Sequence, residues 1–211
     1  MLARFWVAIA AMVVVVAASN FLVQFPVDFQ LGSIHLGDIL TWGAFTYPIA
    51  FLVTDLTNRS FGPARARQAV LAGFAVAVLI SIYLATPRIA IASGTAFLTA
   101  QLLDITIFNR LRTSAWWKAP VVSSLFGSAM DTVIFFSLAF AAPFGVLDTL
   151  FGREDGSLAF PAPLLGVGPE VELWVSLGLG DFTVKLVLAV LLLVPYKTLR
   201  DRLAGRDALA V

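Results

Sequence analysis

Aspartates recur inside stretches of this sequence that are otherwise apolar. Asp55, Asp104, Asp131 and Asp181 occupy such stretches, and Lys185 follows Asp181 four residues later. At that spacing an acid and a base meet on one face of a helix. Because a charge in hydrocarbon costs at least ~2.5 kcal/mol on insertion scales, an ionisable side chain there faces a cavity or a partner. These residues predict a polar site inside a membrane.

The composition of the chain indicates a membrane protein. Of its 211 residues 60% are hydrophobic and 13% are charged, and the mean hydropathy is +0.93. A soluble globule of this length needs more polar surface than that. The chain has no cysteine and one histidine, His35, which excludes disulfides and thiolate metal sites and argues against a histidine metal site. We therefore expect no metal and no cofactor, and the sequence has no GxxxxGK nucleotide-binding loop.

Six apolar stretches of about 20 residues predict membrane-spanning helices. We expect one domain over residues 1–211, an all-α polytopic membrane protein built as a six-helix transmembrane bundle. An arginine-rich loop joins the second helix to the third. A short turn is expected around 147–151, within the one long loop, 143–172. The expected helices cover about 5–23, 36–56, 68–86, 89–108, 119–142 and 171–194.

The basic residues predict the orientation of these helices. If the helices alternate in direction, eleven of the 14 lysines and arginines fall on one side of the membrane. Arg88 and Arg153 fall on the other side, and Lys185 lies within the last span. By the positive-inside rule, the side rich in lysine and arginine is the cytoplasm. Both termini are therefore expected in the cytoplasm, and the long loop outside.

The second span carries a predicted break at mid-depth. Pro48 removes a backbone hydrogen bond and clashes with the carbonyl of Ala44, so a kink is expected after Tyr47. The freed carbonyl needs a partner, from a neighbour or from a ligand. Trp42, Phe45 and Tyr47 add flat aromatic faces beside the kink. Such rings more often face lipid or the core, but together with carboxylates they suit a planar, hydrogen-bonding heterocycle.

The intramembrane carboxylates have functional and structural interpretations. Asp131 lies about 12 residues, or roughly 18 Å, into the fifth helix without a partner nearby in sequence, which favours a functional role. Asp181 and Lys185 either form a structural ion pair or contact a substrate or proton directly. Asp55 and Asp104 lie within a turn of the cytoplasmic surface, where pairing with an arginine is the simpler interpretation. The polar network expected at this end comprises Asp55, Asn58, Asn109 and Arg110, with Arg59 and Arg65 as further pairing candidates.

Three runs of residues resemble one bacterial transporter family. The runs are Thr41-Trp42-Gly43-Ala44-Phe45 with Thr54-Asp55-Leu56-Thr57, Gln101-Leu102-Leu103-Asp104 with Phe108-Asn109-Arg110, and Asp131-Thr132 before Phe135-Phe136. With these runs the chain resembles the queuosine precursor transporters, earlier grouped as vitamin uptake transporters, over about residues 19–199.

This resemblance implies a fold and a substrate. Members are six-helix proteins of the bacterial inner membrane, similar in outline to the substrate-binding subunits of energy-coupling-factor importers. They import 7-cyano-7-deazaguanine, with 7-aminomethyl-7-deazaguanine left open, for salvage into tRNA modification. The implied partners are this small 7-deazapurine and membrane lipid, without nucleic acid, and a homodimer stays open. With the residues above, the expected substrate-binding set is Asn20, Gln24, Trp42, Phe45, Tyr47, Gln101, Asp104, Asp131, Asp181 and Lys185.

Other functions stay open beside this one. Gly178-Leu179-Gly180-Asp181 matches the GxGD element of intramembrane aspartyl proteases, but the Tyr-Asp pair that those enzymes also need is absent from the sequence, and we expect no enzyme. The chain could instead depend on a separate ATPase module, or carry another small heterocycle or vitamin.

A guanine-like edge presents N–H and amine donors side by side, which a carboxylate accepts as a pair. Asp131 and Asp181 are equal candidates for that contact.

Overall fold

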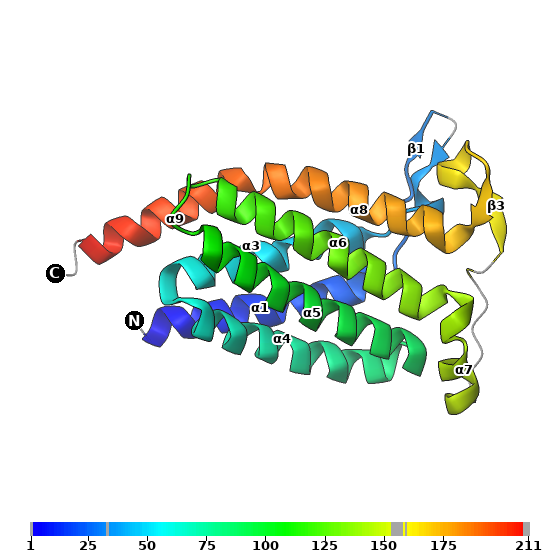
Figure 1. Ribbon diagram of the computed structural model, residues 1–211, viewed down its shortest axis with the longest axis horizontal. Helices are drawn as coiled ribbons and strands as arrows, with labels where there is room; N and C mark the ends of the chain where they lie inside the picture. Colours follow the sequence, from blue (N-terminus) through cyan, green and yellow to red (C-terminus); the bar gives the residue numbers. More distant parts are fainter. Residues whose placement is uncertain (1, 33, 153–157, 159, 209–211) are drawn as a thin grey trace.

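The long helices of the protein lie side by side along one axis (Figure 1). The computed structural model describes residues 2–32, 34–152, 158 and 160–208, with side chains as far as residue 203. Within these ranges five helices are long and apolar enough to cross a membrane. The prediction of an all-α polytopic membrane protein is thereby confirmed. The five are α1 (Leu2–Leu22), α4 (Pro63–Leu84), α5 (Pro87–Leu111), α6 (Lys118–Phe140) and α8 (Leu173–Leu191).

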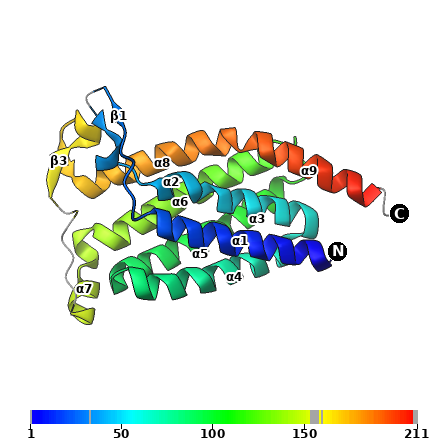
Figure 2. The ribbon, with the colours of Figure 1, turned by 180° about the vertical axis from the view of Figure 1, so that it is seen from behind.

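The second predicted span is a broken helix. It consists of α2 (Trp42–Thr46) and α3 (Pro48–Phe61), which follow one another beside α1 (Figure 2). Tyr47 between them keeps helical angles, φ −58° and ψ −40°, so the break is a kink and not a loop. The predicted interruption before Pro48 is confirmed. Because α2 and α3 are each shorter than a membrane span, the count of six spans stays a prediction.

The broken helix begins later than the predicted residue 36. The segment before it forms a short antiparallel hairpin of β1 (Gln30–Leu31) and β2 (Ile34–His35), followed by a 3-10 turn, η1 (Leu36–Asp38). Thr41 then pairs with Pro26 and is extended, with φ −115° and ψ 162°. Backbone hydrogen bonding to the preceding chain therefore keeps residues up to Thr41 out of the helix.

The broken helix also ends later than the predicted residue 56. It continues to Phe61 and stops at Gly62, whose φ of 82° favours glycine. Pro63 then occupies the first position of α4, where its missing N–H costs nothing. The arginine-rich segment predicted as a loop is therefore the end of α3 and the first turns of α4.

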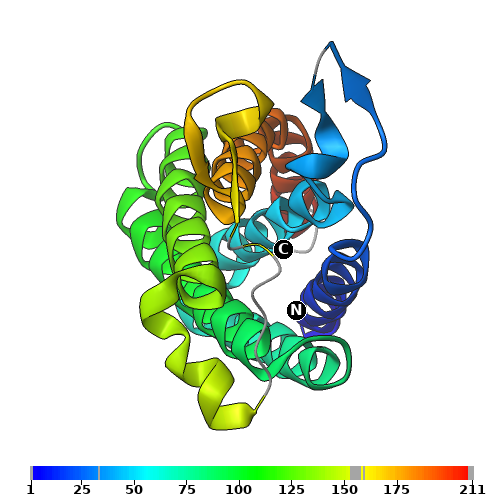
Figure 3. The same ribbon diagram turned by 90° about the vertical axis from the view of Figure 1, so that its right-hand side faces the viewer.

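The remaining elements gather at the two ends of the bundle. At one end lie α7 (Val146–Phe151), which confirms the turn predicted around 147–151, and a hairpin of β3 (Pro161–Pro163) and β4 (Glu170–Glu172) (Figure 1, Figure 3). The 3-10 turn η2 (Ala142–Phe144) precedes α7, and η3 (Leu164–Gly166) lies between β3 and β4. At the other end α1 begins and α9 (Leu193–Ala208) continues the line of α8 (Figure 1). The sequence did not predict α9 beyond residue 194.

Small residues let the helices approach one another closely. A Cβ added to Gly73 of α4 would lie 2.7 Å from Met12 Cγ of α1, and one added to Gly127 of α6 would lie 2.7 Å from the ring of Phe51 in α3. Such close packing holds helices together in lipid, where the hydrophobic effect does not. Large apolar side chains of the same helices are exposed to the outside, among them Leu79, Ile82, Val133 and Val187.

Arg88 joins three elements at the end opposite the termini. Its Nη1 lies 2.5 Å from Oδ2 of Asp148 in α7, and its Nε and Nη2 donate to the carbonyls of Leu138 (2.8 Å) and Ala141 (2.6 Å) at the end of α6. The side chains of Arg88 and Asp148 are only 6% and 9% exposed. A buried ion pair therefore fixes α7 to α5 and α6.

We expect Arg88→Met to lower the free energy of unfolding in detergent by about 3–5 kcal/mol, because Asp148 is left as a buried charge without its partner. Arg110→Met, which removes an exposed arginine from the same helix, should change it by about 0.5 kcal/mol at most. Thermal unfolding of the two purified variants measures the difference. Equal melting temperatures would show that this ion pair does not stabilise the fold.

Candidate functional site

A cavity of about 530 Å³ lies within the helical bundle. Its walls come from α1, α2, α4, α5, α6 and α8. This volume falls in the range of small-molecule binding sites, which are mostly apolar with a few placed polar groups. The polar lining residues include Ser19, Asn20, Gln24, Tyr47, Ser93, Asp131, Asp181 and Lys185.

Two aspartates and a lysine form an ion triad in the wall of this cavity. Lys185 Nζ in α8 lies 2.6 Å from Asp131 Oδ2 in α6 and 2.5 Å from Asp181 Oδ2, one turn earlier in α8. We call these three residues the carboxylate–lysine triad. A buried ammonium is tolerated only when it is paired, and here two carboxylates share it. With all three groups ionised the triad carries a net charge of −1.

Neighbouring hydroxyl groups hold the triad in place. Tyr47 donates to Asp131 Oδ1 at 3.1 Å, and its ring centroid lies 5.3 Å from Lys185 Nζ. Thr132 Oγ1 donates to Asp181 Oδ2 at 2.9 Å and lies 3.3 Å from Lys185 Nζ. The kink before Pro48 therefore positions a tyrosine whose hydroxyl and ring both contact the triad.

All three members of the triad line the cavity, and Asp181 is the most exposed of them. Its side chain is 17% exposed, against 6% for Asp131 and 4% for Lys185. Asp131 uses both oxygens, one on Lys185 and one on Tyr47. Both contacts of Asp181 involve Oδ2, so its Oδ1 receives no hydrogen bond from the residues that the structure describes. That oxygen is the acceptor available to a ligand with N–H donors.

Two predicted residues, Asn20 of α1 and Gln24 just after it, also reach the cavity. Asn20 donates its amide N–H to the carbonyl of Val16 at 2.9 Å, and Gln24 donates to the carbonyl of Phe21 at 3.3 Å. These local bonds use the NH₂ groups and leave the side-chain carbonyl oxygens as acceptors. Asn20 and Gln24 therefore add two further acceptors to the lining.

The aromatic lining differs from the prediction. Phe135, Phe136 and Tyr47 line the cavity, whereas Trp42 and Phe45 do not. Trp42 is 49% exposed, and its ring packs on Phe45 at a centroid distance of 5.8 Å. At 3.6 residues per turn, Tyr47 points to nearly the opposite side of the helix from Phe45. The structure thus corrects the placement of Trp42 and Phe45, because only Tyr47 lies on the inner face.

Gln101 and Asp104 also lie outside the cavity, contrary to prediction. In α5 the cavity lining ends at Ala96, and Asp104 lies eight residues, or roughly 12 Å, farther along the helix. Both side chains are fully buried and face α3. They form, with residues of α3 and α6, a second polar site. We call it the buried carboxyl cluster, and it comprises Thr54, Asp55, Asn58, Gln101, Asp104 and Ser123.

Hydrogen bonds between helices connect part of the buried carboxyl cluster. Thr54 donates to Gln101 Oε1 at 2.6 Å, and Asn58 donates to the carbonyl of Ile105 at 3.1 Å. Ser123 Oγ lies 3.4 Å from Asp55 Oδ1. Sequence reasoning missed Ser123, although it shares a face of α6 with Asp131 at helical spacing.

The arginines expected beside this cluster do not neutralise it. Within the described residues Asp55 and Asp104 form no ion pair with Arg59 or any other basic side chain. Arg59 instead donates to the hydroxyl of Tyr196 at 3.1 Å and to the carbonyl of Arg112. The predicted arginine pairing is therefore wrong, because Arg59 points toward the end of α5 and α9.

The other two members of the predicted network lie at the surface. Asn109 and Arg110 are exposed at the end of α5, and Asn109 accepts from Arg112 at 3.5 Å. The expected network of four residues is therefore divided. Asp55 and Asn58 belong to the buried carboxyl cluster, and Asn109 and Arg110 do not.

The glycines of the GxGD match serve helix packing. A Cβ added to Gly178 would lie 3.3 Å from the ring of Phe136, and one added to Gly180 would lie 3.0 Å from the carbonyl oxygen of Ile39. Both positions favour glycine because α8 approaches its neighbours closely there. The four-residue match is thus explained without catalysis.

A charged, ligand-sized cavity inside a bundle with an apolar outer surface defines a class of protein. Ionisable groups placed in the interior of membrane helices mark sites for polar solutes or ions, and transporters place such sites beside broken helices. The fold and the cavity together are those of a small-solute membrane transporter.

The comparisons with known proteins identify the family. The family model described as putative vitamin uptake transporter matches residues 41–86 and 81–199. The queuosine precursor transporter of Escherichia coli (strain K12) is 34% identical, over 98% of this chain and 90% of that protein. A probable queuosine precursor transporter of Haemophilus influenzae is 36% identical, over 86% of this chain and 79% of that protein. No solved structure matches the chain. The chain belongs to the family of these queuosine precursor transporters, as its sequence runs predicted.

Proposed function

We propose that this protein imports a queuosine precursor across the bacterial inner membrane and binds it at the carboxylate–lysine triad. One observation carries the proposal: the free Oδ1 of Asp181 faces a cavity of about 530 Å³. The family relationship over most of the chain supports the substrate class.

The chemistry of 7-cyano-7-deazaguanine fits this cavity. Its guanine-like edge presents a ring N–H and an exocyclic amine side by side, and a carboxylate accepts such donors strongly. Asp181 supplies that acceptor, and Phe135 and Phe136 supply apolar ring surface for a planar heterocycle. Asn20 and Gln24 offer further acceptors to the opposite edge.

The cavity favours entry from the periplasmic side. Its lining includes Leu84 at the end of α4, Thr86 just before α5 and Phe140 at the end of α6. These helix ends lie opposite the termini (Figure 1). The basic residues support cytoplasmic termini by the positive-inside rule. In this orientation α2 and α3 together make the sixth crossing, and the cavity reaches the periplasmic end of the bundle, from which a precursor would enter.

Queuosine in tRNA provides the test of this function. A bacterium that neither synthesises 7-cyano-7-deazaguanine nor has its own importer is supplied with nanomolar precursor, with and without this gene. We expect queuosine to appear in tRNA only when the gene is present. Absence of queuosine, with the protein shown to be in the membrane, would contradict the proposal and direct the search to other heterocycles, to vitamins, or to a partner ATPase.

A further inference from the structure

Two carboxyl groups face each other in the buried carboxyl cluster. Asp55 of α3 is 2% exposed and Asp104 of α5 is 0% exposed, and the two groups interact across the interface of these helices. Neither oxygen of Asp104 has a hydrogen-bond partner within the described part of the chain. Because a buried polar atom without a partner is costly, this site lacks a donor.

Within the described residues no basic side chain forms an ion pair with Asp55 or Asp104. Arg59 of α3 acts electrostatically on Asp55, but its hydrogen bonds go elsewhere. Lys185 of α8 binds the triad, and Arg200 of α9 binds Asp201 at 2.6 Å. Arg65 of α4 is exposed and stacks on a phenylalanine ring of α1. Among the titratable groups, Tyr196 of α9 accepts from Arg59 of α3, and α6 contributes the uncharged Ser123.

Electrostatics then favours a proton at this pair. On a general scale, two like unit charges at about 4 Å repel by about 4 kcal/mol even at an effective dielectric constant of 20, so two ionised carboxylates that interact in a buried site are unfavourable. Carboxyl groups that share a buried site therefore hold a proton between them. A proton shared by Asp55 and Asp104 also provides the O–H donor that Asp104 lacks, and it needs no additional space between the helices.

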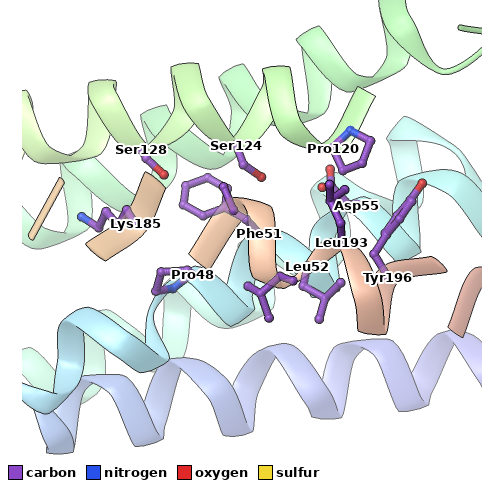
Figure 4. A pocket seen from close by; sticks show the side chains of 12 residues that line it. Pro48, Phe51, Leu52, Asp55, Pro120, Ser124, Ser128, Lys185, Leu193 and Tyr196 are labelled. Carbon is purple, nitrogen blue, oxygen red and sulfur yellow. The ribbon is translucent and has the colours of Figure 1, made fainter. Parts of the chain in front are cut away.

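A small cavity is lined by Asp55 of this pair and by Lys185 of the carboxylate–lysine triad. Its volume is about 20 Å³, enough for one water molecule. Figure 4 shows Lys185 toward one end of the cavity and Asp55 toward the other, with Ser128 and Ser124 between them. The two serines lie four residues apart on one face of α6. Two serines and space for one water molecule therefore line the cavity between Asp55 and Lys185.

We propose that Asp55 and Asp104 form the proton-binding site of the transporter, so that one proton enters the cell with each precursor molecule. The inference rests on the proposed function. The carboxyl pair changes from a charge of −2 to −1 when it takes up the proton, and it returns to −2 when it releases the proton to the cytoplasm. The accompanying change in field reaches Lys185 across the small cavity and couples the proton to the substrate site.

Transport by the purified protein in liposomes tests the coupling. With one proton per neutral precursor, an inward gradient of one pH unit should drive about tenfold accumulation of labelled 7-cyano-7-deazaguanine. Asp104→Asn should abolish this accumulation and still exchange labelled for unlabelled precursor across the membrane. Asp201→Asn makes the same change at an exposed position of α9 and should accumulate precursor as the unaltered protein does.

Several results would overturn the inference. Full accumulation by Asp104→Asn would do so, and so would accumulation that follows a sodium gradient instead of a proton gradient. If Asp104→Asn does not fold, the unaltered protein decides: the medium should become more alkaline as precursor enters, and entry without proton movement would overturn the coupling. Failure of the unaltered protein to exchange precursor at all would instead overturn the proposed function.

Discussion

Asp181→Asn should weaken the binding of 7-cyano-7-deazaguanine by about 10- to 150-fold, since a hydrogen bond to a charged group contributes about 1.5–3 kcal/mol. The substitution keeps the shape of the side chain and removes the charge from the most exposed carboxylate of the triad. Lys185 keeps its 2.6 Å contact with Asp131, so the fold should persist. Titration of labelled precursor into the protein in detergent measures the dissociation constant.

Two matched substitutions define what that result means. Asp201→Asn changes an exposed aspartate of α9 and should leave the dissociation constant unaltered. Asp131→Asn should have the smaller effect of the two triad variants on binding, because both oxygens of Asp131 already contact Lys185 and Tyr47. A larger loss in Asp131→Asn than in Asp181→Asn would assign the substrate contact to Asp131 instead.

Hydropathy predicted most of the helices because lipid leaves a backbone segment few alternatives to a helix. It failed at the ends of the broken helix, where single residues decide. Thr41 is extended through its pairing with Pro26, and Gly62 stops the helix with a φ of 82°. A window averaged over about 20 residues does not register either effect. The broken helix therefore begins and ends later than predicted, although the kink at Pro48 was predicted from proline chemistry alone.

In the candidate site, sequence spacing predicted the contact within one helix but not the contacts between helices. The Asp181–Lys185 pair follows from spacing on one helix. The partner of Asp131, in contrast, is 54 residues away in the chain, and no local pattern specifies that contact. The prediction grouped Gln101 and Asp104 with the substrate residues because all were polar and intramembrane. Their position along α5 places them beyond the cavity and away from the substrate residues. That position relative to the cavity depends on how the helices are aligned in the bundle.

Lys185→Met should prevent stable folding, because it leaves Asp131 and Asp181 as two buried carboxylates with no cation between them. Removing one partner from a buried ion pair costs about 3–5 kcal/mol, and here one lysine serves two partners at 2.6 Å and 2.5 Å. We expect a low yield of protein in the membrane and a lower melting temperature in detergent. A yield and melting temperature equal to those of the unaltered protein would contradict a structural role for the ion pair.

A triple variant separates the structural role of the triad from its role in transport. Asp131→Asn and Asp181→Asn combined with Lys185→Met remove all three charges, so no unpaired charge stays buried, and stability should largely return. Uptake should not return, because the cavity then lacks the charged acceptor that binds the precursor. Recovery of both stability and uptake would show that the triad only holds α6 and α8 together and that the substrate contacts lie elsewhere in the cavity.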